Sequence, residues 1–447
     1  MAKDLTSSRP RGTILLNVLA VLIFIAIVAA GLYGMYSSLR LNQQLADLKS
    51  RGLPTNREEL NAWYAVPADG NDTTEQWTAA TKAIANVNIY SRAQGIPLVG
   101  DGPQPVPPPG EEWAELEASR SFLKEMDREQ QLIMVAADAG GMARYPVDFK
   151  DGLNALQTDQ QQTRNLARLL SLSAHVHAHD GQSQDVLKDV KSIFAVSGSL
   201  DCEPSMTAQI ICNAVHAMGC ALTVHMLPHC QWSDKELEEL QLAVGETVFR
   251  KNLQRAYYGE LAIMLESLET LPSLSVFRIV VSRDNSRSKV IELMDASARA
   301  MDLSWAETVE SFNPTSQEMM ATTIDPVSPV SHIIVSLSLP ALQGGIISGI
   351  RTEARQNCCI AAIATQRYRI KHGTLPRRLT DLKDFIPAED TSNLSRLMDR
   401  FDGQPLRFKT SETGVIIYSI SENKVDDGGD VDNARRVSAD LGYLISE

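Results

Sequence analysis

The segment Thr163–His179, "TRNLARLLSLSAHVHAH", carries the pattern that decides the fold. Its apolar residues Leu166, Leu169, Leu170 and Ala174 recur at the i, i+3, i+4, i+8 spacing of one buried helix face. The residues "DGQSQ" that follow break this period. The segment therefore predicts an amphipathic helix that ends at a turn and packs against other helices.

Further helices are expected directly after this one. "DVLKDVKSIFAVSGSL" repeats the pattern from Val186 to Phe194, and a largely apolar helix is expected over 206–227. Ser233 and Glu236 stand in the register of a capping box, which marks the start of another helix. Short connections make consecutive helices antiparallel neighbours, so we expect a helical bundle or a TPR-like stack, although no strict repeat is present.

Composition limits the class of partner. The chain has 447 residues and a net charge of −13, and its basic residues are scattered along the sequence. A nucleic-acid partner is therefore not expected, because such proteins gather lysine and arginine on one stripe. The length leads us to expect two to three domains.

The N-terminus predicts a membrane anchor. Residues 1–12 form a short basic lead, and residues 13–36, "TILLNVLAVLIFIAIVAAGLYGMY", contain no charged residue. This length suffices for a helix to cross a bilayer core of about 30 Å, so lipid is the expected partner of 13–36. Because the positive charges precede the span, we expect a single-pass protein of the cytoplasmic (inner) membrane, with the N-terminus cytoplasmic and the bulk extracytoplasmic. A cleaved signal peptide is the alternative.

The rest of the chain divides into three expected parts. Residues 37–110 mix a polar helix with loops and end in the proline-rich linker "GDGPQPVPPPG". Residues 111–355 form the helical domain, in which the apolar segment 332–350 is expected to be a core segment. Residues 356–447 form a small α+β domain whose strands "PLRFKT" and "GVIIYSI" are expected to pair as a hairpin.

The C-terminal fifth of the chain resembles the globular domain of the major pseudopilin of type II secretion systems. The elements that carry the resemblance are, in order, "HGTLPRRLTDL", "FDGQPLRF", "IIYSI", the pair Gly428-Gly429 and a final "ADLG". The resemblance implies a pseudopilin-like α+β fold and a calcium site in the acidic loop near the end. A true pilin-type leader would be cut after Gly12, but Asn17 stands where that leader carries a glutamate.

Calcium and a solvated acidic turn are the two hypotheses for this loop. Carboxylate oxygens on a flexible segment suit calcium. However, the aspartate that the family places before the glycines falls near Asn423, and Ala434 stands where an EF-hand would need its next ligand. The candidate ligands are Asp426, Asp427, Asp430, Asp432 and Asp440.

The longer central part resembles a group of membrane-anchored helical proteins of planctomycete-type bacteria. The segments that carry this resemblance are "AWYAVPADGND", "ARYPVDF", "LARLLSLSAHVHAHDGQ", "EPSMTAQIICNAV" and "YYGELA". The resemblance implies an architecture and no activity.

Two sets of histidine and cysteine residues, each on one face of an expected helix, suggest a transition-metal site, a weaker hypothesis than calcium in the acidic loop. His175 and His179 share a helix face at i, i+4, whereas His177 does not. Cys212, His216 and Cys220 also lie on one line of a helix, and His225 or His229 would supply another zinc ligand. Exposed polar residues at a helix end, and small thiols on a buried face, are the competing explanations. Buried thiols are also the expectation for all six cysteines.

Serine-hydrolase patterns are short and scattered. Ser286–Lys289 fits S-x-x-K, Ser311–Asn313 fits S-x-N, and Lys409–Ser411 approaches K-T-G without its glycine. No convincing catalytic constellation is present, so catalysis is not expected. The sequence predicts a protein that interacts with or scaffolds an unknown protein partner at the cell envelope or a secretion assembly. An envelope hydrolase and a pseudopilin-type subunit are the alternatives.

Overall fold

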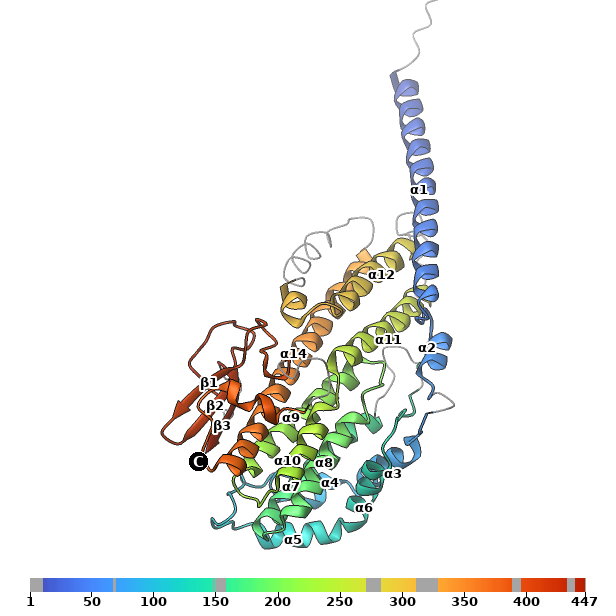
Figure 1. Cartoon of the computed structure of the whole chain (residues 1–447). Helices are drawn as coiled ribbons and strands as arrows, with labels where there is room; N and C mark the ends of the chain where they lie inside the picture. The colour runs from blue at the N-terminus through green and yellow to red at the C-terminus, as the bar shows by residue number, and fades with distance from the viewer. Residues whose placement is uncertain are drawn as a thin grey trace, which may run out of the picture.

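The computed structural model describes residues 11–66, 70–147, 149, 158–270, 283–310, 329–387, 395–431 and 439–446. The protein is mainly helical with a small C-terminal sheet and an apolar N-terminal helix, as predicted (Figure 1). The helices are α1 (Arg11–Ser50), α2 (Arg57–Tyr64), α3 (Thr74–Asn86), α4 (Ile89–Arg92), α5 (Leu116–Glu125), α6 (Asp127–Ala139), α7 (Thr158–His179), α8 (Ser183–Gly198), α9 (Met206–Met226), α10 (Asp234–Gly245), α11 (Phe249–Thr270), α12 (Arg283–Ala300) and α14 (Pro329–His372). Two 3₁₀ helices, η2 (Leu379–Phe385) and η3 (Ser395–Leu397), precede the strands β1 (Arg407–Ser411), β2 (Gly414–Ser419) and β3 (Leu441–Ser446).

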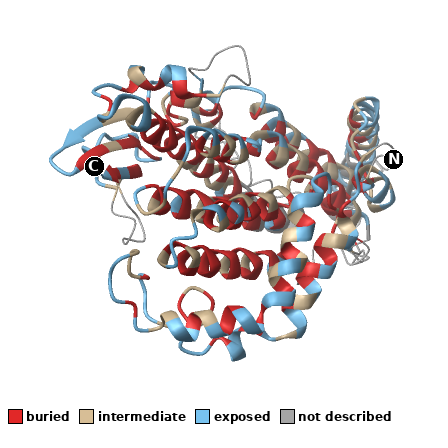
Figure 2. Cartoon of the chain, turned by 60° about the horizontal axis from the view of Figure 1, so that its bottom comes forward, coloured by how far each residue is buried: buried red, intermediate tan, exposed pale blue. Residues whose placement is uncertain are grey.

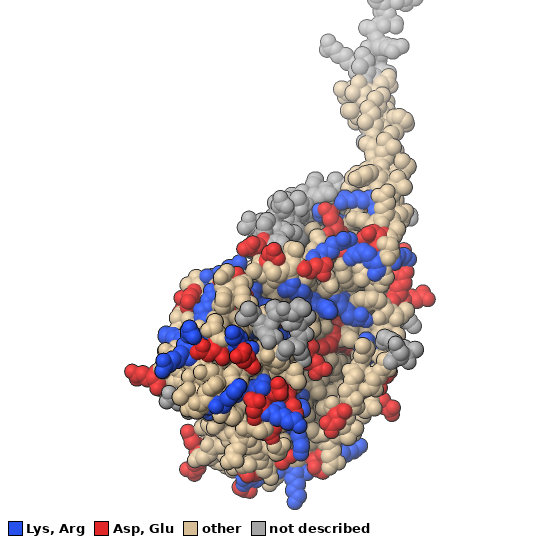
Figure 3. Space-filling view, viewed as in Figure 1, with Lys and Arg blue, Asp and Glu red and all other residues tan. Residues whose placement is uncertain are grey.

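Helix α1 is long and apolar enough to cross a bilayer. Large apolar side chains are exposed along it from Leu15 to Leu39, and its upper part projects beyond the body of the molecule (Figure 1). The visible face of that part carries no charged side chain (Figure 3). Helix α9 also has the length and composition of a span, but 67% of its apolar window is buried inside the protein. Helix α9 is thus a core helix, and α1 is the candidate anchor.

The lower end of α1 belongs to the body of the molecule. Leu41 and Leu48 are buried in a cluster shared with α11, α12 and α14. On the outer side, Arg40 pairs with Glu292 of α12 at 3.0 Å, and Arg51 pairs with Asp295 of α12 at 2.8 Å. The upper part of α1 is exposed and apolar, and its lower end is buried in the body. The same helix therefore joins the candidate anchor to the body without a separate linker.

Helices α7, α8 and α9 pack against one another at the centre of the body. The predicted face of α7 is confirmed, because Leu166, Leu169, Leu170 and Ala174 are fully buried. Burying each leucine contributes roughly 1.5–3 kcal/mol of transfer free energy. In Figure 2, buried residues cover the faces that the helices of the body turn toward one another. The capping box at Ser233 and Glu236 is also present and starts α10.

The connection between α8 and α9 passes very close to α11. A Cβ atom at Gly259 would stand 2.0 Å from the carbonyl oxygen of Pro204, so only glycine fits there. This contact brings the buried residues 203–205 against α11.

The C-terminal sheet is antiparallel in the order β1-β2-β3. The predicted hairpin is confirmed, with Ser411 opposite Gly414 across the turn. Strand β3 was not predicted from the sequence; it pairs with β2 and places Tyr443 opposite Ile417. Strands β2 and β3 pack on α14.

Helix α14 links the sheet to the helices. The expected boundary at 355/356 falls inside this helix. One cluster of buried side chains continues from Trp77 in α3 to Ile445 in β3. In the apolar segment 332–350, Ile346 and Ile350 are buried, while the side chains before Gln343 lie outside the described set.

Candidate functional site

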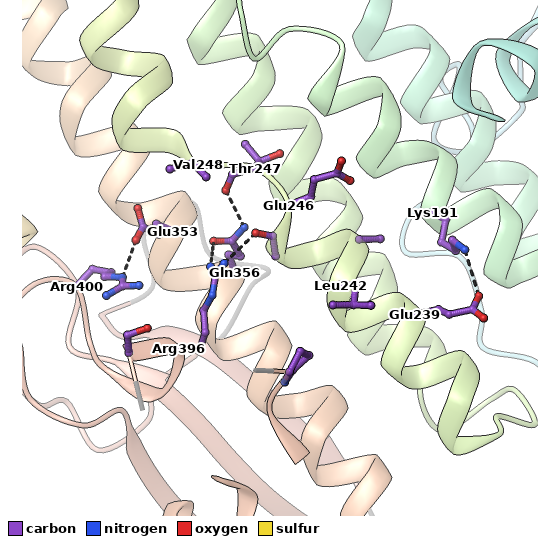
Figure 4. Close-up of a pocket in the computed structure, with 14 residues that line it drawn as sticks. Lys191, Glu239, Leu242, Glu246, Thr247, Val248, Glu353, Gln356, Arg396 and Arg400 are labelled. Carbon is purple, nitrogen blue, oxygen red and sulfur yellow. Dashed lines mark hydrogen bonds and ion pairs between the residues drawn. The ribbon is translucent and has the colours of Figure 1, made fainter. Parts of the chain in front are cut away.

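A groove of about 760 Å³ lies between the α10–α11 turn, α14 and the segment that carries η3 (Figure 4). We call it the α10–α14 groove. Its lining residues are Lys191, Glu239, Leu242, Ala243, Gly245, Glu246, Thr247, Val248, Glu353, Gln356, Pro387, Ser395, Arg396 and Arg400.

The floor of the groove is built from the C-terminal end of α10. Side chains satisfy the carbonyl groups that a helix end leaves without partners. Gln356 Nε2 donates to the carbonyl oxygens of Val244 at 2.6 Å and Thr247 at 3.2 Å. Arg396 donates to Gly245 O at 2.9 Å and to Gln356 Oε1 at 3.1 Å. These bonds hold the Arg396 side chain against the end of α10.

One wall of the groove is held by Glu353 of α14. Its Oε1 pairs with Arg400 at 2.7 Å, and its Oε2 accepts a hydrogen bond from Trp305 Nε1 at 2.6 Å. The guanidinium of Arg250 lies over the Trp305 ring at 4.4 Å from its centre. Glu353 therefore bonds both to Arg400, which lines the groove, and to the buried Trp305.

The rim of the groove offers both apolar and charged surface. Leu242 is 39% exposed and Val248 is 48% exposed, although both are large aliphatic residues. At the far end, Lys191 pairs with Glu239 at 3.2 Å, and Glu246 is exposed. An apolar rim over hydrogen-bonding groups is suited to binding an extended chain.

The acidic loop that the sequence analysis singled out is organised around Asp440. This buried carboxylate accepts hydrogen bonds from the backbone N–H groups of Gly429 at 2.8 Å and Asp427 at 3.5 Å. Asp426 accepts from Gly428 N and from Tyr418 Oη, both at 2.9 Å. Asp430 accepts through its main-chain oxygen from Asp440 N at 3.2 Å, and Asp432 lies outside the described residues. Calcium binding by this loop stays a prediction.

His175 and His177 of α7 have different neighbours. His177 Nδ1 lies 2.8 Å from the buried Asp189 Oδ2. His175 faces His225 instead, and His225 faces His229. The fold thus brings His175 of α7 next to His225 of α9, a pairing that neither metal hypothesis predicted, and among the described residues no group of three His, Cys, Asp or Glu could hold a metal ion.

The side chains of Cys212, His216 and Cys220 are buried in the core. Cys212 and Cys220 are fully buried and free of disulfides, as are Cys358 and Cys359 of α14. His216 lies between the rings of Phe194 and Phe249, with centroid distances of 5.0 and 4.9 Å. None of these side chains lines the α10–α14 groove.

The serine-hydrolase residues are placed on separate elements. Ser286 is a buried residue of α12, whereas Lys409 is in β1 and donates to Gly428 O at 2.8 Å. Ser311–Asn313 lies outside the described residues.

One buried carboxylate with several hydrogen-bond donors around it, that of Glu203, was not predicted from the sequence. Glu203 accepts hydrogen bonds from the hydroxyl of Tyr64, from Tyr145 N at 3.2 Å and from Gln160 Nε2 at 2.9 Å. Burial raises the pKa of Glu203 to about 7. The available signal was an acidic residue in the short "CEPS" connection between two buried helices.

No family model, no curated protein and no solved structure matches this chain. Fold and site by themselves define a mainly helical protein with an N-terminal apolar helix and a small C-terminal sheet. The two family resemblances stay predictions.

Proposed function

We propose that this chain is a membrane-anchored extracytoplasmic protein that holds an extended segment of a partner protein in the α10–α14 groove. The groove carries the proposal, because it combines the exposed side chains of Leu242 and Val248 with the exposed carboxylate of Glu246. An extended segment has the apolar side chains and the unpaired backbone groups that such a surface recognises.

The anchor supports this function by restricting where binding takes place. With the N-terminus cytoplasmic, helix α1 would hold the body at the outer face of the cytoplasmic membrane. Because Leu41 and Leu48 fix α1 into the body, the groove keeps a defined orientation toward the bilayer. A rigid scaffold of this kind lowers the ordering cost when a second membrane-bound protein docks.

Site-specific crosslinking in cells tests the proposal. A photo-reactive amino acid is placed at Leu242 or Val248, and the control carries it at Leu303, which is 45% exposed and does not line the groove. We expect one protein species to crosslink at the groove positions and not at the control. That species is then identified, purified and titrated against the full chain in detergent.

Affinity measurements on the two purified proteins distinguish specific binding in the groove from incidental contact. We expect Leu242→Glu to weaken binding by at least about tenfold, which corresponds to about 1.4 kcal/mol. Leu303→Glu is the matched control, because it adds the same charge at a leucine of similar exposure. Equal affinity of both variants, or equal crosslinking at all three positions, would show that the groove is not the binding site.

A further inference from the structure

A cavity of about 310 Å³ lies between the end of α9, the C-terminal part of α14 and strand β3. We call it the α9–β3 cavity. Its volume is at the lower end of the range of small-molecule sites, which is about 300–1,000 Å³. The described residues that line it are Ala221, Val224, His225, Leu227, Pro228, His229, Gln366, Arg369, Val431, Tyr443, Leu444, Ile445 and Ser446. This lining contains no acidic residue, although the chain has 55 acidic and 42 basic residues.

Arg369 of α14 gives the α9–β3 cavity a positive charge. Its Nη1 donates a hydrogen bond to the carbonyl oxygen of Ser446 in β3 at 3.2 Å, which holds the guanidinium at the cavity wall. This bond uses one of the five N–H groups of the guanidinium. Within the described part of the chain, no carboxylate pairs with Arg369. A guanidinium without an acidic partner is suited to binding the carboxylate of another molecule.

Gln366 offers further donors beside Arg369. The two residues are three positions apart on α14 and therefore share a face of the helix. Gln366 is only 7% exposed, yet no described group forms a hydrogen bond with its side-chain amide. Buried polar groups in proteins normally have such a partner. The amide thus has two N–H donors for a molecule in the cavity, and together with the guanidinium it can serve both oxygen atoms of one carboxylate.

The two histidines of the lining add no positive charge at neutral pH. Burial and the neighbouring His229 lower the pKa of His225. Burial also lowers the pKa of His229, against the opposing effect of Glu111. Both imidazoles are therefore neutral at pH 7. Among the described lining residues, Arg369 alone supplies the charge that a ligand meets at this pH.

Much of the remaining wall is apolar. Val224 and Leu227 at the end of α9 are buried, and Leu444 of β3 is 43% exposed. A ligand that covers these side chains gains free energy from the apolar surface that it removes from water. An inorganic anion would leave this wall uncovered, and a neutral molecule would leave the guanidinium without a counter-charge. The lining thus matches a molecule with one anionic group and an apolar body.

We propose that the α9–β3 cavity binds a small organic carboxylate. Its carboxylate group contacts Arg369 and Gln366, and its apolar body lies against Val224, Leu227 and Leu444. This site shares no lining residue with the α10–α14 groove and does not depend on the function proposed for that groove.

Calorimetric titration of the full chain in detergent at pH 7 tests the proposal. The probes are sodium benzoate and sodium hexanoate, and we expect at least one of them to bind saturably at one molecule per chain with a dissociation constant of about 1 mM or tighter. Benzamide has the shape of benzoate without its charge, and inorganic phosphate has charge without an apolar body. We expect each of these two to bind at least about tenfold more weakly.

Variants connect the binding to the cavity. We expect Arg369→Gln to weaken carboxylate binding at least about tenfold, because it removes the charge-assisted hydrogen bonds. Ala221→Phe adds a large side chain at an exposed position of α9 that lines the cavity, so it should block binding without disturbing the core. The control is Arg377→Gln, which makes the same change at an exposed arginine outside the lining. Circular dichroism checks that each variant folds.

Three results would overturn the proposal. The first is the absence of saturable binding of both carboxylates by the unmodified chain. The second is unchanged affinity in the folded Arg369→Gln variant, or in Ala221→Phe if the arginine variant does not fold. The third is binding of benzamide or phosphate as tight as that of the carboxylates, because the charge or the apolar wall would then play no part in recognition.

Discussion

Glu203 shows how one buried residue makes stability depend on pH. Its carboxyl group is almost fully buried and holds Tyr64, Tyr145 and Gln160 around it. Burial raises the pKa of Glu203 from 4.5 to about 7, so the folded state binds its proton more tightly than the unfolded state does. The stability that this group contributes is complete below about pH 4.5 and is lost as pH rises through about 7.

Replacing Glu203 with glutamine should remove this pH dependence. We expect the unfolding free energy of the unmodified chain to fall by at most about 1.4 kcal/mol per pH unit, relative to the Glu203→Gln variant, between about pH 4.5 and 7. Thermal unfolding of both proteins across that range measures the difference. Asp201, whose pKa burial also raises to about 7, contributes equally to both proteins and cancels.

The exposed Glu58 of α2 gives the matched control for this experiment. Glu58→Gln makes the same chemical change at the surface and should leave the pH profile of the unmodified chain intact. Identical profiles for Glu203→Gln and the unmodified chain would show that Glu203 is not the titrating group.

At the scale of the element, Asp440 holds the loop between β2 and β3. Its carboxylate accepts from two backbone N–H groups, and loss of such a charged acceptor from a buried site costs about 1–3 kcal/mol. We expect Asp440→Ala to lower the thermal midpoint both in calcium and in excess chelator, because those bonds exist without an ion.

The same measurement addresses the calcium hypothesis. With both carboxylate oxygen atoms of Asp440 and Oδ1 of Asp426 already accepting hydrogen bonds, we expect calcium to leave the midpoint of the unmodified chain in place. A midpoint that rises with calcium, and does so no longer in an Asp426→Ala, Asp427→Ala variant, would establish a calcium loop instead. Asp384→Ala, outside the loop, is the control.

At the scale of the whole molecule, the junction of α1 with the body sets how the protein meets the membrane. Leu48 is 1% exposed and packs in the cluster shared with α11, α12 and α14. Truncating a buried leucine to alanine costs about 2–5 kcal/mol. We expect Leu48→Ala to lower the thermal midpoint of the full chain in detergent and to speed hydrogen exchange over residues 41–50.

The control for the junction is Leu39→Ala on the same helix. Leu39 is 56% exposed, so its truncation leaves the packing of the body unchanged. Equal midpoints and equal exchange rates in the two variants would mean that α1 does not depend on this docking. The groove would then lack a fixed orientation toward the bilayer.

The sequence by itself determined the features that rest on local periodicity. The buried face of α7, the capping box of α10, the apolar length of α1 and the hairpin of β1 and β2 were all predicted, because each depends on residues within a few positions of one another. For the same reason the sequence indicated which histidines share a face of α7.

Contacts between residues from distant parts of the chain were decided only by the tertiary structure. The α10–α14 groove joins residues from 191 to 400, and the Glu203 carboxylate has partners from α2 to α7, so neither leaves a local pattern. Strand β3 escaped prediction because its sequence, "LGYLIS", does not alternate apolar and polar residues, although burial alternates along its second half. The pairing of His175 with His225 likewise depends on how α7 packs on α9, which is set by the shape and volume of the whole core.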